Sequence, residues 1–106
     1  MNERTGLNSP ELSKEKFKRA HIFVIGKVQG VFFRLNTEER AKKLGITGWI
    51  KNLEDGRIEA IFEGKKESVE KIIKWTKMGP LTAKVNKADI KWQEYKDEFK
   101  DFEIRY

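Results

Sequence analysis

Hydrophobic residues along this chain occur in short blocks that follow two different spacings. One group of segments is β-branched or alternates between apolar and polar residues, as strands do. These segments are residues 20–28, 46–52, 57–63, 85–95 and 102–106. The second and third are separated by Leu53-Glu54-Asp55-Gly56, whose Asp-Gly pair is typical of a hairpin turn. The pattern therefore predicts five strands, two of them joined by a tight turn.

Two other segments have helical spacing. Residues 34–44 and residues 69–76 repeat their less polar side chains every three or four positions. The residues on these two faces are Thr37, Ala41 and Leu44 in the first segment, and Val69, Ile72, Ile73 and Thr76 in the second. Gly45 follows the first segment and Gly79-Pro80 the second, which are common signals for the end of a helix.

The order of these elements predicts the fold. It is β-α-β-β-α-β with a short C-terminal fifth strand, which indicates a ferredoxin-like α+β sandwich with two helices on one face of an antiparallel sheet. Residues 1–17 are polar and offer little to bury, so they predict a flexible N-terminal extension to a domain of residues 18–106. A chain of 106 residues is too short for a second hydrophobic core.

Composition narrows the classes of function. The chain has no cysteine, and it lacks both an apolar stretch long enough to span a bilayer and the apolar core of a signal peptide. A cytoplasmic protein without membrane contact is expected. The net charge of +6 suits an anionic ligand and raises the question of nucleic acid, although basic residues alternate with acidic ones as on an ordinary solvated surface.

The segment Gly26-Lys27-Val28-Gln29-Gly30-Val31-Phe32-Phe33-Arg34 joins the first strand to the first helix. Glycine allows a turn to expose successive N–H groups, a helix start adds unpaired N–H groups, and arginine matches two phosphate oxygens at once. Such turns also occur in plain strand–helix connections, but the Gly-x-Gly-x-x-Gly and Walker motifs are absent. We therefore expect a phosphate cradle made by Arg34 and the backbone of Gln29, Gly30, Val31, Phe32 and Phe33.

This segment closely resembles the first motif of the acylphosphatase family, in the form Val24-x-Gly26-x-Val28-Gln29-Gly30-Val31-x-Phe33-Arg34. A second segment, Gly48-Trp49-Ile50-Lys51-Asn52 followed by Gly56, Ile58 and Gly64, resembles the second motif of the same family. The resemblance covers roughly residues 18–106. It implies the ferredoxin-like fold and a metal-independent hydrolase, without cofactor, that splits acyl phosphates into carboxylate and inorganic phosphate. It also implies that Asn52 orients the attacking water while the phosphate itself takes the water's proton.

Several residues have a simpler structural interpretation. By itself Asn52, at a strand end, would be a turn former. Gly26 and Gly30 are expected to let the loop close tightly. The lone histidine, His21, is expected to be structural. With no cysteine and no second histidine, no metal site is expected. Val28, Phe33 and Trp49 are expected in the core. Asn36, where many family members carry an aromatic residue, is expected to affect helix packing.

Two alternatives to a stand-alone acylphosphatase remain open. A non-catalytic anion or nucleic-acid binding module could use the same fold, but RNA-recognition domains carry their Gly-Phe motif on the third strand, and here it follows the first. The second alternative is a protein that handles carbamoyl phosphate, since similar domains occur in hydrogenase-maturation proteins. A short chain without attached domains favours the separate enzyme. The expected partners are a small acyl phosphate and inorganic phosphate, with no nucleic acid and no membrane, for a monomer.

Overall fold

The computed structural model describes residues 16–106, and most of the predicted N-terminal extension, residues 1–15, lies outside the described residues. Each predicted strand and helix is present, with boundaries shifted by a few residues. The elements are β1 (Phe17–Lys27), α3 (Phe33–Lys43), β2 (Thr47–Asn52), β3 (Ile58–Lys65), α4 (Lys66–Met78), β4 (Lys84–Gln93) and β5 (Phe102–Arg105). β1 begins three residues before the predicted start, because Phe17 pairs with Lys65 and its ring packs 5.0 Å from that of Tyr95.

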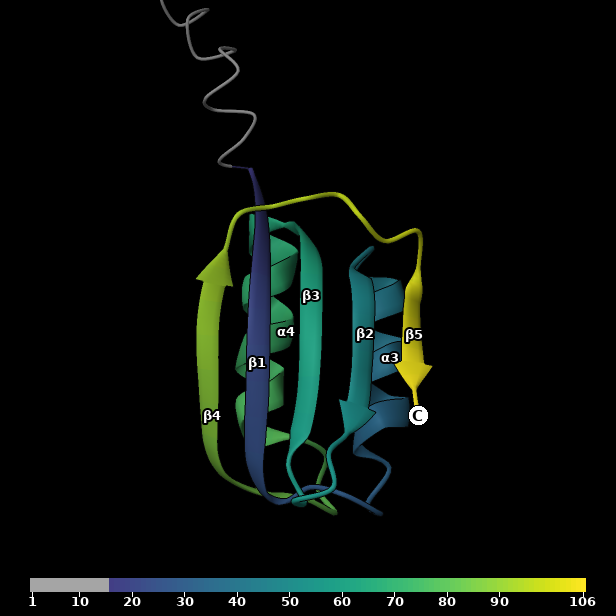
Figure 1. Cartoon of the computed structure of the whole chain (residues 1–106), viewed down its shortest axis with the longest axis vertical. Coiled ribbons are helices and arrows are strands. Elements are labelled where there is room, and N and C mark those ends of the chain that lie inside the picture. The colour runs from purple at the N-terminus through teal and green to yellow at the C-terminus, as the bar shows by residue number, and fades with distance from the viewer. Residues whose placement is uncertain (1–15) are drawn as a thin grey trace, which may run out of the picture.

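The five strands form one sheet in the order β4-β1-β3-β2-β5. Neighbouring strands are antiparallel except for β2 and β5, which are parallel, so the predicted antiparallel sheet is in fact mixed. The reason is the connection after β4. Residues 94–101 cross the end of the sheet from one edge to the other, and β5 then runs back beside β2 in the same direction (Figure 1).

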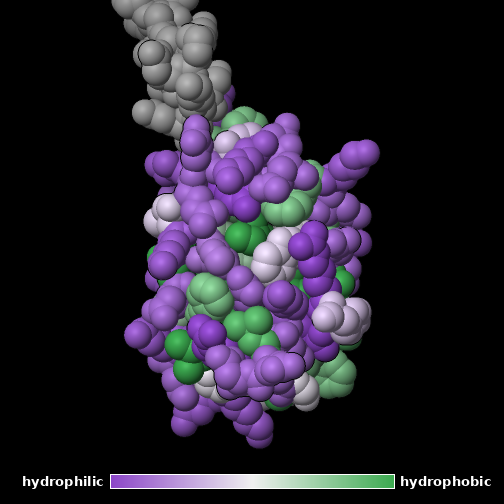
Figure 2. Space-filling view, in the orientation of Figure 1, coloured by the Kyte–Doolittle hydropathy of each residue, from purple (hydrophilic) through white to green (hydrophobic). Residues whose placement is uncertain are grey.

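Both helices cover the same face of the sheet, and the core lies between them and the strands (Figure 1). Side chains alternate along a strand, so Ala20, Ile22 and Val24 of β1 face the helices and are fully buried. The opposite face is open and largely hydrophilic (Figure 2). No helix within residues 16–106 has both the length and the apolar character that a bilayer crossing requires.

Trp49 is not in the core, contrary to its prediction. Its neighbours Gly48 and Ile50 are buried, so the alternation along β2 turns the indole to the open face, where it is half-buried. There the cationic groups of Lys51 and Arg105 lie over its ring, at 5.5 and 5.1 Å from the centroid.

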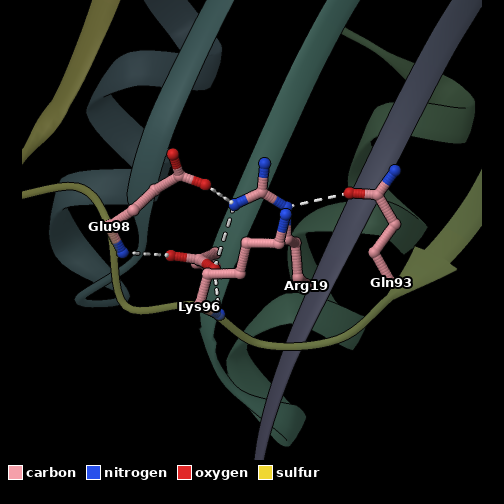
Figure 3. A network of polar contacts seen from close by, with 5 residues as sticks. Arg19, Gln93, Lys96 and Glu98 are labelled. Atoms are coloured by element: carbon pink, nitrogen blue, oxygen red, sulfur yellow. Dashed lines mark hydrogen bonds and ion pairs between the residues drawn. The ribbon is translucent and has the colours of Figure 1, made fainter.

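A buried polar network fixes the segment that crosses the end of the sheet (Figure 3). The carboxylate of Glu63, fully buried on β3, accepts hydrogen bonds from the backbone N–H groups of Lys96 and Glu98 at 2.7 and 3.2 Å. The guanidinium of Arg19 donates hydrogen bonds to the side chains of Glu63, Glu98 and Gln93. The network therefore holds residues 94–101 in the path that delivers β5 to the far edge of the sheet.

Candidate anion-binding site

The loop between β1 and α3, residues 28–32, lies at the end of the molecule where β2 ends and where the C-terminus is found (Figure 1). Gly30 has a φ of 72°, which glycine adopts without steric cost. Phe32 also has a positive φ, 64°, which is uncommon for a bulky side chain. These two residues reverse the chain, and α3 begins immediately afterwards.

Backbone N–H groups are the main resource of this loop. Within residues 16–106, the N–H groups of Gln29 to Phe33 donate no hydrogen bond to another backbone or side-chain group. The N-cap residue of α3, Phe32, provides no capping side chain, and the first helical turn has no acidic residue. An anion would be attracted both by the unpaired N–H groups and by the positive end of the helix dipole.

Side-chain contacts hold the loop on both sides. The amide nitrogen of Gln29 donates to the carbonyl oxygens of Leu53 and Arg57 at 2.8 and 2.9 Å, which ties the loop to the β2–β3 turn. On the other side, the Thr82 hydroxyl donates to the carbonyl of Val31 at 2.7 Å. The loop is therefore fixed relative to the end of β2.

The turn that receives Gln29 is itself held by its own side chains. The carboxylate of Asp55 accepts hydrogen bonds from the backbone N–H and from the guanidinium of Arg57, at 3.1 and 2.9 Å. The backbone hydrogen bond from Arg57 is the main reason that the pKa of Asp55 lies below its ordinary value. The carboxylate therefore caps the turn that begins directly after Asn52.

Arg34 and Asn52 meet at one cavity of about 270 Å³. Arg34 comes from the first turn of α3, and Asn52 is the last residue of β2. The lining residues are Val28, Gly30, Phe32, Phe33, Arg34, Leu35, Asn52, Ile104 and Tyr106. This volume suits a small molecule, and the cavity brings together a cation, an amide and the loop.

The side chains of Arg34 and Asn52 both have unused bonding capacity. Within the described residues, no carboxylate forms an ion pair with Arg34, whose guanidinium carbon lies 5.1 Å from the centroid of the Tyr106 ring. Asn52 Oδ1 is buried and has no hydrogen-bond donor among residues 16–106. An unpartnered buried acceptor is costly and uncommon in native proteins, which makes Asn52 a candidate functional residue.

The predicted site residues therefore lie together, but they do not all face the cavity. Gly30, Phe32, Phe33, Arg34 and Asn52 line it. Val28 and Phe33 also belong to the core, as predicted. Gln29 and Val31 do not line the cavity: the side chain of Gln29 is used in the turn contact and that of Val31 is buried, so only their backbone N–H groups are available to a ligand.

Gly26 and Asn36 have roles other than those expected. Gly26 lies in β1 at a bulge, where an added Cβ would be 2.2 Å from the carbonyl oxygen of Lys84, so it permits close approach of β4 rather than closure of the loop. The Asn36 side chain donates to the carbonyl oxygen of Phe32 at 2.8 Å. It thus supports the strained residue of the loop instead of packing between helices.

Three cavity residues, Leu35, Ile104 and Tyr106, were not identified from the sequence. Leu35 stands directly after Arg34 and could have been found as a non-polar residue on the exposed side of a polar helix. Ile104 and Tyr106 gave no such signal, because their position depends on how β5 pairs. His21 is structural in that it contacts Glu59 at 2.7 Å on the open face. Residues 16–106 contain no cluster of three or more acidic, histidine or cysteine side chains that could bind a metal.

Comparison with known proteins agrees with this geometry. Residues 20–104 match the family model described as Acylphosphatase. The chain is 54% identical over 87 residues to an acylphosphatase of Pyrobaculum calidifontis, covering 81% of this chain and 79% of the relative. It is 49% identical over 88 residues to one from Pelotomaculum thermopropionicum, covering 83% and 96%. The structure of an acylphosphatase from Coxiella burnetii superposes with a TM-score of 0.80 at 35% identity, over 86% of this chain and 95% of that one.

Proposed function

The chain belongs to the acylphosphatase family, and we propose that it hydrolyses acyl phosphates at the cavity between the β1–α3 loop and the end of β2. In this proposal the backbone N–H groups of residues 29–33 and the guanidinium of Arg34 bind the phosphoryl group. Asn52 orients the attacking water. The products are a carboxylate and inorganic phosphate.

The cradle suits a phosphoryl group for electrostatic reasons. The negative charge of a phosphoryl group is shared by three of its oxygens. The loop offers several N–H donors that have no other partner within the described chain. Arg34 adds a permanent charge whose two-pronged geometry matches two oxygens. Donors fixed in advance at the place where charge develops are worth more than mobile ones, because they need no reorganisation during the reaction.

The observation that carries the proposal is the buried, unpartnered Oδ1 of Asn52. A carboxamide oxygen can only accept a hydrogen bond, and an attacking water is a donor that can meet this need. Asn52 reaches the same cavity as Arg34 from a different element, so a water on Asn52 would lie beside a phosphoryl group on the loop. Holding both reactants in this way removes much of the entropic barrier to their meeting.

The chemistry demands little beyond this positioning. An acyl phosphate is a mixed anhydride, so the bond that breaks, between phosphorus and the acyl oxygen, releases a stable carboxylate. The oxygen of water forms the new bond to phosphorus, and its proton passes to a phosphoryl oxygen. No side chain has to act as a strong base, and the charge-assisted donors stabilise the phosphoryl oxygens throughout.

The remaining expectations are part of the same proposal: a cytoplasmic monomer that uses no nucleic acid. Against nucleic acid, β3 carries Glu59 on the open face and uses its buried Glu63 to hold residues 94–101, whereas the third strand of an RNA-binding sheet would need stacking aromatic residues.

The test is a hydrolysis assay with benzoyl phosphate, beside p-nitrophenyl phosphate as an ordinary phosphomonoester and carbamoyl phosphate as the alternative substrate. We expect hydrolysis of benzoyl phosphate and none of the phosphomonoester. Arg34→Gln should lower kcat/KM by at least about 10²-fold, the usual cost of losing one fixed donor to a developing charge. Arg40→Gln, on an exposed position of the same helix, is the matched control and should behave as wild type.

Two results would contradict the proposal. A folded wild-type protein that leaves benzoyl phosphate intact is no acylphosphatase, and hydrolysis of carbamoyl phosphate alone would favour the carbamoyl-phosphate role. Near-normal activity of a folded Arg34→Gln variant would remove Arg34 from the cradle.

A further inference from the structure

Exposed apolar side chains gather around the mouth of the cavity. The described chain has six large hydrophobic residues that are mostly exposed, and three of them line this one cavity. They are Phe32, Leu35 and Tyr106, with 66%, 57% and 98% of their surfaces exposed. Partly buried Ile104 lies among them. We call these four residues the apolar rim.

The backbone of Phe32 shows that its exposure is imposed by the fold. Its φ of 64° and ψ of 20° are left-handed, a conformation that a phenylalanine rarely adopts. Asn36 stabilises it through two hydrogen bonds to the Phe32 carbonyl, at 3.1 Å from its backbone N–H and at 2.8 Å from its side chain. An aromatic ring is thus held in water, on a strained residue, directly beside the phosphate cradle. Strain of this kind is concentrated at functional sites.

Charge is scarce around the same cavity. Among residues 16–106, Arg34 is the only one with a charged side chain that lines the cavity, and the only other polar side chains on the lining are those of Asn52 and Tyr106. When Arg34 binds the phosphoryl group, no second cation remains on the lining for a charged group elsewhere on the substrate. The rest of the substrate therefore meets mainly apolar surface.

We propose that the apolar rim binds the acyl group, and that the protein selects bulky apolar acyl phosphates, aromatic ones above all, over short or charged ones. This inference rests on the proposed function, because it assumes that the phosphoryl group lies in the cradle. The bond from phosphorus to the acyl oxygen then points out of the loop. The acyl substituent emerges at the mouth of the cavity, where Phe32, Leu35 and Tyr106 can contact it.

The expected selectivity is moderate because the rim is open. A partly exposed contact worth one or two methylene groups corresponds to about a five- to tenfold preference. The contact is made by the acyl group in the bound substrate and is absent for inorganic phosphate. Loss of part of the rim should therefore raise KM for an apolar substrate and leave phosphate binding unchanged.

The experiment compares kcat/KM for benzoyl phosphate and acetyl phosphate in wild type, in Leu35→Gln and in Met78→Gln. Both substitutions place the same polar side chain on an exposed, helical, apolar position, but Met78 does not line the cavity. The ratio of the two kcat/KM values in each variant, divided by the wild-type ratio, cancels the difference in intrinsic reactivity. A second variant, Phe32→Asn, removes the ring and keeps a residue that tolerates positive φ.

We expect the benzoyl-to-acetyl ratio to fall about fivefold in Leu35→Gln, through KM for benzoyl phosphate, with the inhibition constant of inorganic phosphate unchanged. Phe32→Asn should lower the ratio in the same direction, and Met78→Gln should match wild type. An unchanged ratio in both rim variants would overturn the inference. So would an equal loss for both substrates together with weaker phosphate inhibition, since that pattern means a damaged cradle. Failure of the proposed function is distinct: wild type would then hydrolyse neither substrate.

Discussion

Replacing Asn52 with alanine should nearly abolish turnover without destabilising the protein. The structure gives the reason. Asn52 Oδ1 has no donor within residues 16–106, and the Asn52 side chain makes no hydrogen bond to any described residue, so truncation breaks no internal contact of this kind. The backbone of Asn52 keeps its pairing with Ile58 in the sheet.

The two hypotheses for Asn52 predict different changes in stability. The Asn52 side chain makes no hydrogen bond to a described residue, so a water-positioning Asn52 can be truncated with the free energy of unfolding nearly unchanged. If Asn52 is instead a turn-forming residue, its truncation should lower the free energy of unfolding by about 1–2 kcal/mol. For a domain of this size, 1 kcal/mol shifts Tm by roughly 4–8 °C, so a thermal melt separates the two.

Kinetics provide the second half of the test. A group that positions the nucleophile is expected to contribute about 10²–10³-fold to kcat, which corresponds to about 3–4 kcal/mol of the barrier. Inhibition by inorganic phosphate should stay close to wild type, because the loop and Arg34 are untouched. The measurements are kcat and KM for benzoyl phosphate, the phosphate inhibition constant and Tm, with Asn86→Ala on exposed β4 as the matched control.

Retained turnover in a folded Asn52→Ala variant would refute the assignment of the water to Asn52. A lower Tm with little kinetic change would show that Asn52 is a turn residue. Weaker phosphate inhibition in parallel with the loss of kcat would show that it binds phosphate instead.

Three further predictions test other parts of the molecule. Glu63→Gln should lower the free energy of unfolding by about 3 kcal/mol and leave kcat unchanged, because it leaves Arg19 without one buried charged partner. The control is Glu103→Gln, at an exposed ion pair, which should have little effect on Tm. Equal Tm values for the two variants would contradict the role of the network. Inorganic phosphate should inhibit competitively and EDTA should not inhibit, and activity restored by a divalent ion after EDTA treatment would disprove the metal-free mechanism. Deletion of residues 1–15 should leave kcat and KM unchanged, because residues between Val28 and Tyr106 already form a lined cavity within the part of the chain that the structure describes. A collapse in turnover would show that the segment reaches the site.

The local features of this protein were determined by its sequence. Alternation and 3.6-residue spacing located the strands and helices, because burial on one side imposes those periods on any chain. The parts of the proposed phosphate cradle were also visible in the sequence, since its N–H groups, its glycine and Arg34 lie within one short segment. The positive φ angles of Gly30 and Phe32 are local to this segment, whereas its placement beside β2 depends on the distant contacts of Gln29 and Thr82.

The tertiary structure decided what depends on contacts between distant segments. Trp49 lies on the open face because its neighbours Gly48 and Ile50 are the residues of β2 that are buried. β5 is parallel to β2 because the chain crosses the end of the sheet on a path held by Glu63. That crossing also brings Ile104 and Tyr106 to the cavity. The burial of Asn52 Oδ1 likewise arises only when β2 meets the loop before α3. Periodicity records which side of an element is buried, but the partner that covers it is set by packing over the whole chain.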